Sequence, residues 1–455
     1  MAETHWNKLG AYLKETQILG SIQNTLYWDQ NTGMPKKGAS WRSEQLTYIA
    51  KVLHERNSSE EFSNLIQSAK NELADIERNS DNQLFIKDKE RNISLLLKEF
   101  NRERNLDPKL VESLAKAKSK GYESWQEAKE KSDFKIFLPF FEELVKLRIE
   151  EAKQISDQYS PWETLAQPFE PELTLKWLNK MFQPLKDTLP ELIRGINKSK
   201  KYHWDLSPES QHNLCSQLLD EFGRDKDLVV VGKSPHPFSI TLGPNDYRIT
   251  TRIVEGEPLS SFLATAHEWG HSIYEQGLPS QSHQWFAWPL GQATSMGIHE
   301  SQSLFWENRI VKSKSFSKRF FNKFVSAGCS LNNYLELWKS INHLEAGLNR
   351  VEADELTYGL HILIRTELEI DLIERGLPAE DIPTEWNKRY DELLGIKPSN
   401  DSEGCLQDVH WSEGAFGYFP SYLLGHVISA QISSQMERDI GLIDNLIENG
   451  EYQKI

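Results

Sequence analysis

The chain contains 455 residues, with 52 Lys and Arg against 67 Asp and Glu, so its formal net charge is −15. This acidic balance, without any run rich in Lys or Arg, argues against nucleic acid and anionic membranes as partners. No apolar run approaches the roughly 20 residues that a membrane helix needs, and the three cysteines are widely spaced, so we expect a soluble cytoplasmic protein with free thiols at Cys215, Cys329 and Cys405.

Residues 1–160 show the apolar periodicity of α-helices almost throughout. Apolar residues recur at spacings of three and four, for example at Phe140, Leu144 and Leu147, and Glu and Lys fill the other faces. The pattern predicts long antiparallel helical hairpins. Prolines interrupt it at three positions, after which residues 172–225 return to helix.

Three short segments then favour β-structure. Residues 228–231, 238–242 and 247–253 are rich in β-branched and aromatic side chains. Residues 243–246 read Gly-Pro-Asn-Asp, which is typical of a turn. The sequence therefore predicts a small hairpin or sheet.

The whole chain is expected to form one mainly α domain, residues 1–455, because neither a linker nor an internal repeat interrupts it. Its parts are a mainly helical region over 1–225, a small β-sheet over 226–256, and a helical catalytic part over 257–455.

The pattern His267-Glu268-Trp269-Gly270-His271 carries most of the expected chemistry. Two His four residues apart lie on one face of a helix, so both imidazoles can reach one metal ion. Glu268 then lies near the open side of the metal, where it can take a proton from a water molecule. The alternative is a solvated or core helix in which the two His coincide by chance.

The neighbouring sequence predicts the helix that this pattern requires. Pro258 suits a first helical turn, Ser260 or Ser261 is a candidate cap, and Gly277 suits a helix end. Gly270 lacks a side chain, so another element or a ligand can approach it closely.

A zinc site of this kind needs a third protein ligand and an open fourth position. The candidates are Glu275, His283, His299 and Glu300. Glu300 is the preferred ligand because it begins a second helical pattern, and a carboxylate from a neighbouring helix usually completes a two-His site. Glu275 would have to reach back along its own helix. His299 is interpreted as an outer-layer residue, a substrate contact or a packed core His.

A peptide hydrolase also needs hydrogen-bond donors for the tetrahedral oxyanion. His410 and the nearby Tyr418 and Tyr422 are candidates, and aromatic core packing is the alternative. Arg350 is a candidate clamp for a substrate carboxylate. The sequence by itself favours an ion pair between Arg350 and the acids at 352–355 instead.

Ordered motifs cover nearly the full length of the chain. They are Trp28 to Pro35, His236-Pro237-Phe238, Asp246-Tyr247-Arg248-Ile249-Thr250, His267 to His271, His299-Glu300-Ser301-Gln302, Arg350 to Asp354 and Gly404 to Trp411. Taken together, these segments resemble the carboxypeptidase Taq family of metallocarboxypeptidases.

The resemblance implies a helical fold around a deep active-site cleft, a homodimer, and a zinc-type carboxypeptidase that also works with cobalt. It implies that one divalent metal is bound by His267, His271 and Glu300, with Glu268 as general base. The spacing from His410 to Tyr422 is similar to that of related peptidases in which the Tyr stabilises the oxyanion. The substrate-binding candidates are Arg350, His236 and Tyr418.

The expected function is therefore metal-dependent removal of C-terminal residues from peptides. One alternative is a metalloendopeptidase or dipeptidase on the same fold, which would differ in whether it recognises a free carboxylate. The other is a helical binding protein without catalysis. Glu268 beside both His argues against that second alternative.

Overall fold

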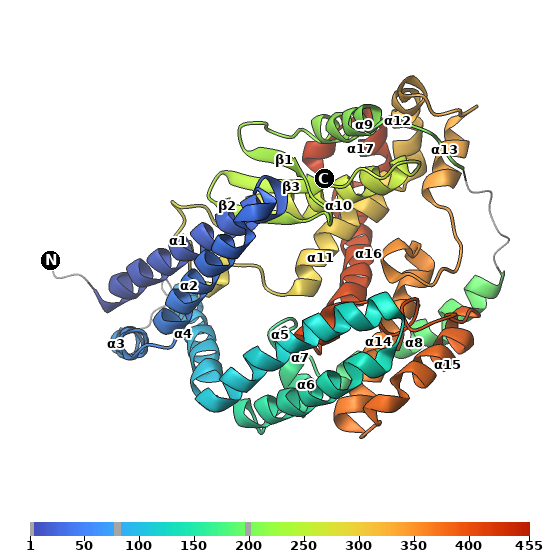
Figure 1. The fold of residues 1–455 in the computed structure, drawn as a ribbon. Coiled ribbons are helices and arrows are strands. Elements are labelled where there is room, and N and C mark those ends of the chain that lie inside the picture. The colour runs from blue at the N-terminus through green and yellow to red at the C-terminus, as the bar shows by residue number, and fades with distance from the viewer. Residues whose placement is uncertain (1–3, 77–82, 196–201) are drawn as a thin grey trace.

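The computed structural model describes residues 4–76, 83–195 and 202–455. It confirms a mainly helical architecture with one small sheet (Figure 1). The helical predictions for 77–82 and 196–201 lie outside the described residues. Among the described helices, none is both long and apolar enough to cross a bilayer.

The part of the chain before the sheet is helical, as predicted. Its helices are α1 (His5–Thr32), α2 (Ala39–Asn57), α3 (Glu60–Ala74), α4 (Gln83–Arg104), α5 (Pro108–Lys131), α6 (Phe134–Ile155), α7 (Pro161–Ala166), α8 (Leu175–Gly195) and α9 (Pro208–Glu221).

Helices α1 and α2 form an antiparallel hairpin, which confirms the predicted arrangement. Near the start of α2, Arg42 pairs with Asp29 near the end of α1 at 2.6 Å. At the other end, Arg56 pairs with Glu15 at 2.7 Å.

The three β-prone segments form one sheet. Its strands are β1 (Val229–Lys233), β2 (Ser239–Gly243) and β3 (Asp246–Thr251), in the spatial order β1-β3-β2. Strand β1 runs parallel to β3, and β2 runs antiparallel to it with a register shift between Thr241 and Gly243. The predicted turn joins β2 to β3.

Helices again dominate after the sheet. They are α10 (Pro258–Gly277), α11 (Met296–Leu304), a π-helical segment (Phe305–Val311), α12 (Lys314–Ala327), α13 (Tyr334–Ile341), α14 (Glu355–Glu374), α15 (Ile382–Leu394), α16 (Pro420–Ile440) and α17 (Ile443–Asn449).

The prediction of helix throughout 257–455 is wrong over 278–295, 342–354 and 395–419, which contain only short 3₁₀ turns (Pro289–Gly291, Arg350–Glu352 and His410–Glu413). Gly414 and Gly417 adopt φ values of 68° and 82°, which a continuing helix does not allow. The irregular segment 395–419 nevertheless places His410 and Asp408 beside the buried face of α14.

Three clusters of buried apolar side chains hold the fold together. The first lies among α5 to α8, α14, α15 and the 405–419 segment. The second lies among α9, the sheet, α10, α12, α13 and α17, and the third joins α1, α3 and α4.

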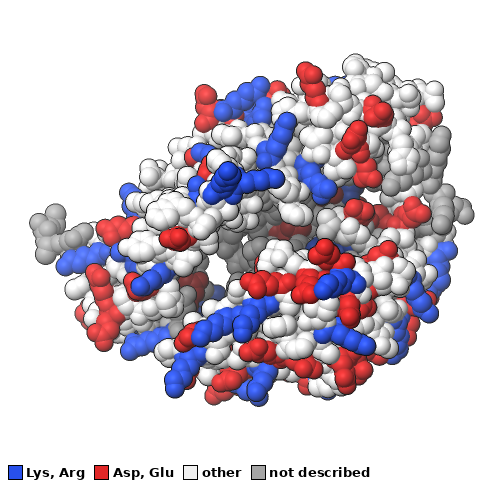
Figure 2. All heavy atoms as spheres, viewed as in Figure 1, with Lys and Arg blue, Asp and Glu red and all other residues white. Residues whose placement is uncertain are grey.

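Helices α10, α11 and α16 lie in the middle of the molecule (Figure 1). Figure 2 shows a face that is hollowed between its upper and lower parts. That the clusters belong to one domain stays a prediction.

Candidate metal centre and active site

Helix α10 presents the His-Glu-x-x-His pattern as predicted. It begins at Pro258 and ends at Gly277. The predicted cap is wrong, because Glu257 occupies the cap position without a side-chain hydrogen bond. Ser261 is buried inside the helix, where its hydroxyl donates to the Pro258 carbonyl and to Gln211 Oε1, both at 3.1 Å.

Gly270 lets α11 lie directly against α10. A Cβ at this position would be 2.5 Å from the Gln302 carbonyl oxygen and 2.5 Å from Ser303 Cα, far inside van der Waals contact. The predicted close approach therefore exists, and the approaching element is α11. This packing brings Glu300 beside the two His of α10.

His267, His271 and Glu300 form a compact group whose possible ligand atoms all lie within 4.8 Å of one another. Glu300 Oε2 is 3.8 Å from His267 Nε2 and 3.5 Å from His271 Nε2. Two imidazole nitrogens and one carboxylate oxygen are the three protein ligands of many catalytic zinc sites. The fourth coordination position of such a site stays open for water or substrate. The residues present therefore fit one divalent metal.

His267 is held from behind by Glu307, which lies on the π-helical segment. His267 Nδ1 is 3.0 Å from Glu307 Oε2, and Lys312 Nζ lies 3.1 Å from the other carboxylate oxygen. A carboxylate on the second ring nitrogen fixes the orientation of a metal-binding His. The sequence interpretation missed Glu307, although its spacing of seven residues from Glu300 was a usable helical signal.

His271 is held by a different chain of contacts. Its Nδ1 lies 2.6 Å from His299 Nδ1, and His299 Nε2 lies 2.9 Å from Glu275 Oε1. His299 and Glu275 thus contact the Nδ1 side of His271, the side that faces away from Glu300. This agrees with the interpretation of His299 as a residue that supports a metal ligand. His283 Nδ1 instead accepts a hydrogen bond from the Trp285 backbone at 3.1 Å.

Helix α16 supports Glu300 from the opposite side. A Cβ on Gly425 would be 2.7 Å from Glu300 Cγ, so only glycine leaves room for this side chain. Tyr422 lies three residues earlier on α16 and therefore on the same helical face. This geometry directs Tyr422 toward the side of the helix that packs against Glu300.

The electrostatics of the group favour a positive charge between the carboxylates. Burial opposes protonation of His267, but Glu300, Glu307 and Glu268 outweigh it and raise the His267 pKa to about 10. A divalent cation would supply such a charge. Burial raises the pKa of Glu268 to about 7, with Glu300 and Glu307 adding to the rise.

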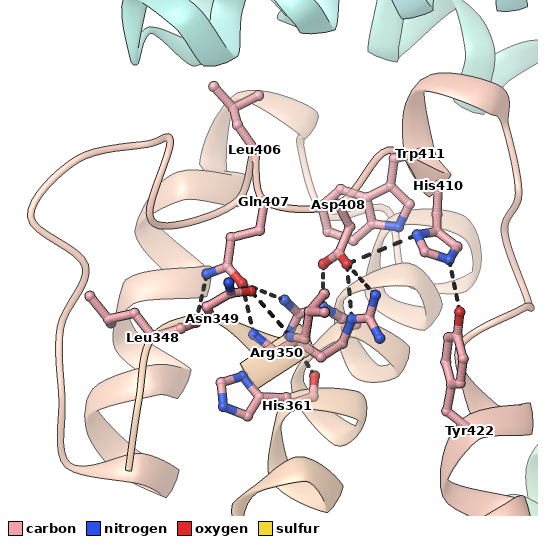
Figure 3. Close-up of polar contacts among 12 residues, drawn as sticks. Leu348, Asn349, Arg350, His361, Leu406, Gln407, Asp408, His410, Trp411 and Tyr422 are labelled. Carbon is pink, nitrogen blue, oxygen red and sulfur yellow. Dashed lines mark hydrogen bonds and ion pairs between the residues drawn. The ribbon is translucent and has the colours of Figure 1, made fainter. Parts of the chain in front are cut away.

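Besides the ligand group, the site contains a pair of polar side chains, His410 and Tyr422 (Figure 3). The Tyr422 hydroxyl lies 3.4 Å from His410 Nε2, and the Tyr418 ring centroid is 5.2 Å from each of the other two rings. Burial, with Arg350 and Arg365 nearby, lowers the pKa of His410 to about 4 despite Asp408. His410 is therefore neutral at pH 7 and carries one N–H donor.

Arg350 is buried and forms an ion pair, but not with the acids at 352–355 that the sequence suggested. Its Nε and Nη2 each lie 2.9 Å from Asp408 Oδ1, and Nη1 donates to the Tyr358 hydroxyl at 3.2 Å. The guanidinium carbon lies 4.9 Å from the centre of the Tyr422 ring, so Arg350 borders the His410–Tyr422 pair.

His236 lies in the loop between β1 and β2, where it is exposed to solvent. Its backbone carbonyl accepts a hydrogen bond from Ser234 Oγ at 2.6 Å. The substrate-binding role of His236 stays a prediction.

Comparison with known proteins agrees with this geometry. A profile of the carboxypeptidase Taq (M32) metallopeptidase family matches residues 8–455. Thermostable carboxypeptidase 1 of Thermus thermophilus is 34% identical over 468 residues, which cover 99% of this chain and 90% of the relative. Carboxypeptidase 1 of Bacillus subtilis is 34% identical over 442 residues, which cover 94% and 85%. A solved structure of Pyrococcus furiosus carboxypeptidase has a TM-score of 0.92 at 29% identity and covers 99% of this chain and 90% of that one. The chain therefore belongs to the carboxypeptidase Taq (M32) family of metallopeptidases, which confirms the resemblance carried by its motifs.

Proposed function

We propose that this metallopeptidase is a metal-dependent carboxypeptidase that removes C-terminal residues from peptides, with His267, His271 and Glu300 as metal ligands. The observation that carries the proposal is the compact three-ligand group with Glu268 buried beside it. Zinc is the proposed metal because the donor set suits it, and cobalt is expected to substitute. A homodimer and a cytoplasmic location remain predictions.

Glu268 is the proposed general base. A divalent metal held by the three ligands would polarise the scissile carbonyl and lower the pKa of a water molecule from about 15.7 to about 7. Glu268 takes a proton from the attacking water and then delivers it to the nitrogen of the leaving amino acid. Glu307 and the His299–Glu275 pair hold the two ligand imidazoles in place while this happens.

Tyr422 and His410 are the proposed oxyanion donors, with Tyr418 as the alternative to Tyr422. In the structure the Tyr422 hydroxyl faces His410, so one of the two groups accepts from the other. A small rotation of the Tyr422 side chain would free its O–H for the oxygen of the tetrahedral intermediate.

We expect Tyr422→Phe to lower kcat by roughly 100-fold with little change in KM, the usual effect of losing one oxyanion donor. Steady-state kinetics on a short peptide checks this, with Tyr418→Phe measured in parallel. A change confined to KM would make Tyr422 a substrate contact only, and the larger kcat effect in Tyr418→Phe would move the role to Tyr418.

Recognition of a free C-terminus distinguishes this function from the related activities. Burying a carboxylate requires a positively charged partner, and Arg350 is the proposed one. Amidation of the peptide C-terminus is expected to slow hydrolysis at least ~10-fold, because a charged contact is lost. Rates on a matched free-acid and amidated pair, followed by mass spectrometry, check this.

Equal rates on the two peptides would identify an endopeptidase, and release of product only from dipeptides would identify a dipeptidase. A helical binding protein would turn over neither peptide with metal present. Arg350→Ala is expected to remove most of the preference for the free acid or to change the peptide length that is preferred. An unchanged preference would assign the carboxylate contact to another group.

A further inference from the structure

A buried ionic cluster joins the carboxylate-binding and oxyanion parts of the site (Figure 3). We call Arg350, Arg365 and Asp408 the Asp408 cluster. Arg350 contacts Oδ1 of Asp408 at 2.9 Å, and Arg365 Nε contacts Oδ2 at 2.5 Å. His410 Nδ1 lies 4.0 Å from Oδ1. One carboxylate is therefore shared by two guanidinium groups.

Arg365 is the most firmly held member of this cluster. It is fully buried on α14, where Nη1 donates to the His361 carbonyl at 2.9 Å and to the Tyr390 hydroxyl at 3.2 Å. Its Nη2 donates to Gln407 Oε1 at 3.0 Å. A helix-anchored guanidinium with this many partners has a single defined position, and it fixes the 407–408 segment relative to α14.

The charge of the Asp408 cluster matters for the proposed role of Arg350. A pair made only of Arg350 and Asp408 would be neutral, and its Arg would attract a peptide carboxylate weakly. With two guanidinium groups and one carboxylate, the cluster carries one excess positive charge. Because Arg350 and Arg365 are buried and the Asp408 side chain is only 10% exposed, water screens this charge little.

We propose that Arg365 is a positioning residue for substrate recognition: by sharing Asp408 with Arg350, it leaves Arg350 with the positive charge that binds the C-terminal carboxylate of a peptide. This role rests on the proposed carboxypeptidase function and deepens it. Arg365 acts through Asp408 and does not itself touch the substrate. Arg365 lies outside the motifs that carry the family resemblance.

The test compares Arg365→Gln and Arg365→Lys by the ratio of kcat/KM on a free-acid peptide to that on its amidated form. Arg365→Gln leaves a neutral Arg350–Asp408 pair, so the ratio is expected to fall from at least ~10 to below ~3, through a higher KM on the free acid. Arg365→Lys restores the charge and is expected to recover most of the ratio.

Arg389→Gln is the matched control, because Arg389 is a mostly buried Arg on α15 that pairs with Asp371 of α14, outside the Asp408 cluster. It is expected to keep the ratio of the unmodified protein. An unchanged ratio in Arg365→Gln, or equal losses in the Gln and Lys variants, would overturn the proposal. If Arg365→Gln does not fold, the Lys variant decides, since a folded Lys variant without preference contradicts the charge argument. Equal rates of the unmodified protein on both peptides would instead refute the proposed function itself.

Discussion

Glu268→Gln is expected to lower kcat by a factor on the order of 10² to 10⁴ or more while the protein keeps its metal. The amide matches the carboxylate in size but cannot accept a proton from the attacking water. Glu275, the other glutamate within α10, is paired with His299 at 2.9 Å and so does not replace Glu268. The measurement is kcat on a free-acid peptide together with metal content by elemental analysis.

Glu257→Gln provides the matched control for this substitution. Glu257 is exposed at the start of the same helix and is expected to tolerate the change without loss of activity. Near-normal turnover in Glu268→Gln would assign the general base to another residue. Loss of metal together with activity would make Glu268 a structural support of the ligands.

Removal of the metal is expected to abolish activity, and zinc or cobalt is expected to restore it. The unmodified protein should bind about one divalent metal per chain, because the structure brings together one complete three-ligand group among the described residues. Glu300→Ala removes one of the three donors and is expected to prevent stoichiometric binding. The measurements are a metal titration against a competing chelator and activity before and after chelation.

Measurements on Glu275→Ala and Glu307→Ala distinguish the metal ligands from the residues that only hold those ligands in place. Each removes a carboxylate that holds a ligand His through hydrogen bonds, so metal affinity should fall by only about 10- to 100-fold. If Glu275→Ala alone empties the site while Glu300→Ala does not, the ligand assignment is wrong. Full activity in metal-free protein would contradict the whole mechanism.

The sequence could predict those parts of the site that depend on the periodicity of a single helix. His267 and His271 share a face because of the 3.6-residue period, and Pro258 and Gly277 mark the ends of that helix. Glu300 could be preferred over Glu275, His283 and His299 because a carboxylate from a neighbouring helix usually completes a two-His site. The mainly helical fold and its small sheet followed from the apolar periodicity in the same way.

The parts that could not be predicted depend on contacts between distant segments. Arg350 is separated from Asp408 by 58 positions, and α14 lies between them in the chain. Nothing local distinguishes Asp408 from the nearer acids at 352–355. The irregular path over 395–419 was missed for a different reason: Gly414 and Gly417, which take positive φ values, are local turn signals that the interpretation did not use.

The tight contacts at Gly270 and Gly425 also constrain any attempt to make this protein more heat-resistant. Replacing a helical glycine by alanine commonly raises stability by about 0.4–1 kcal/mol, because it restricts the unfolded chain. At Gly270 and Gly425 the added methyl group would push apart α10, α11 and α16, and with them the geometry around Glu300. Gly20 on α1 has no neighbouring atom within 4 Å of a built Cβ, so its helix can accept the same change. Gly20 is therefore open to replacement by alanine, whereas Gly270 and Gly425 must stay glycine to keep the geometry of the active site.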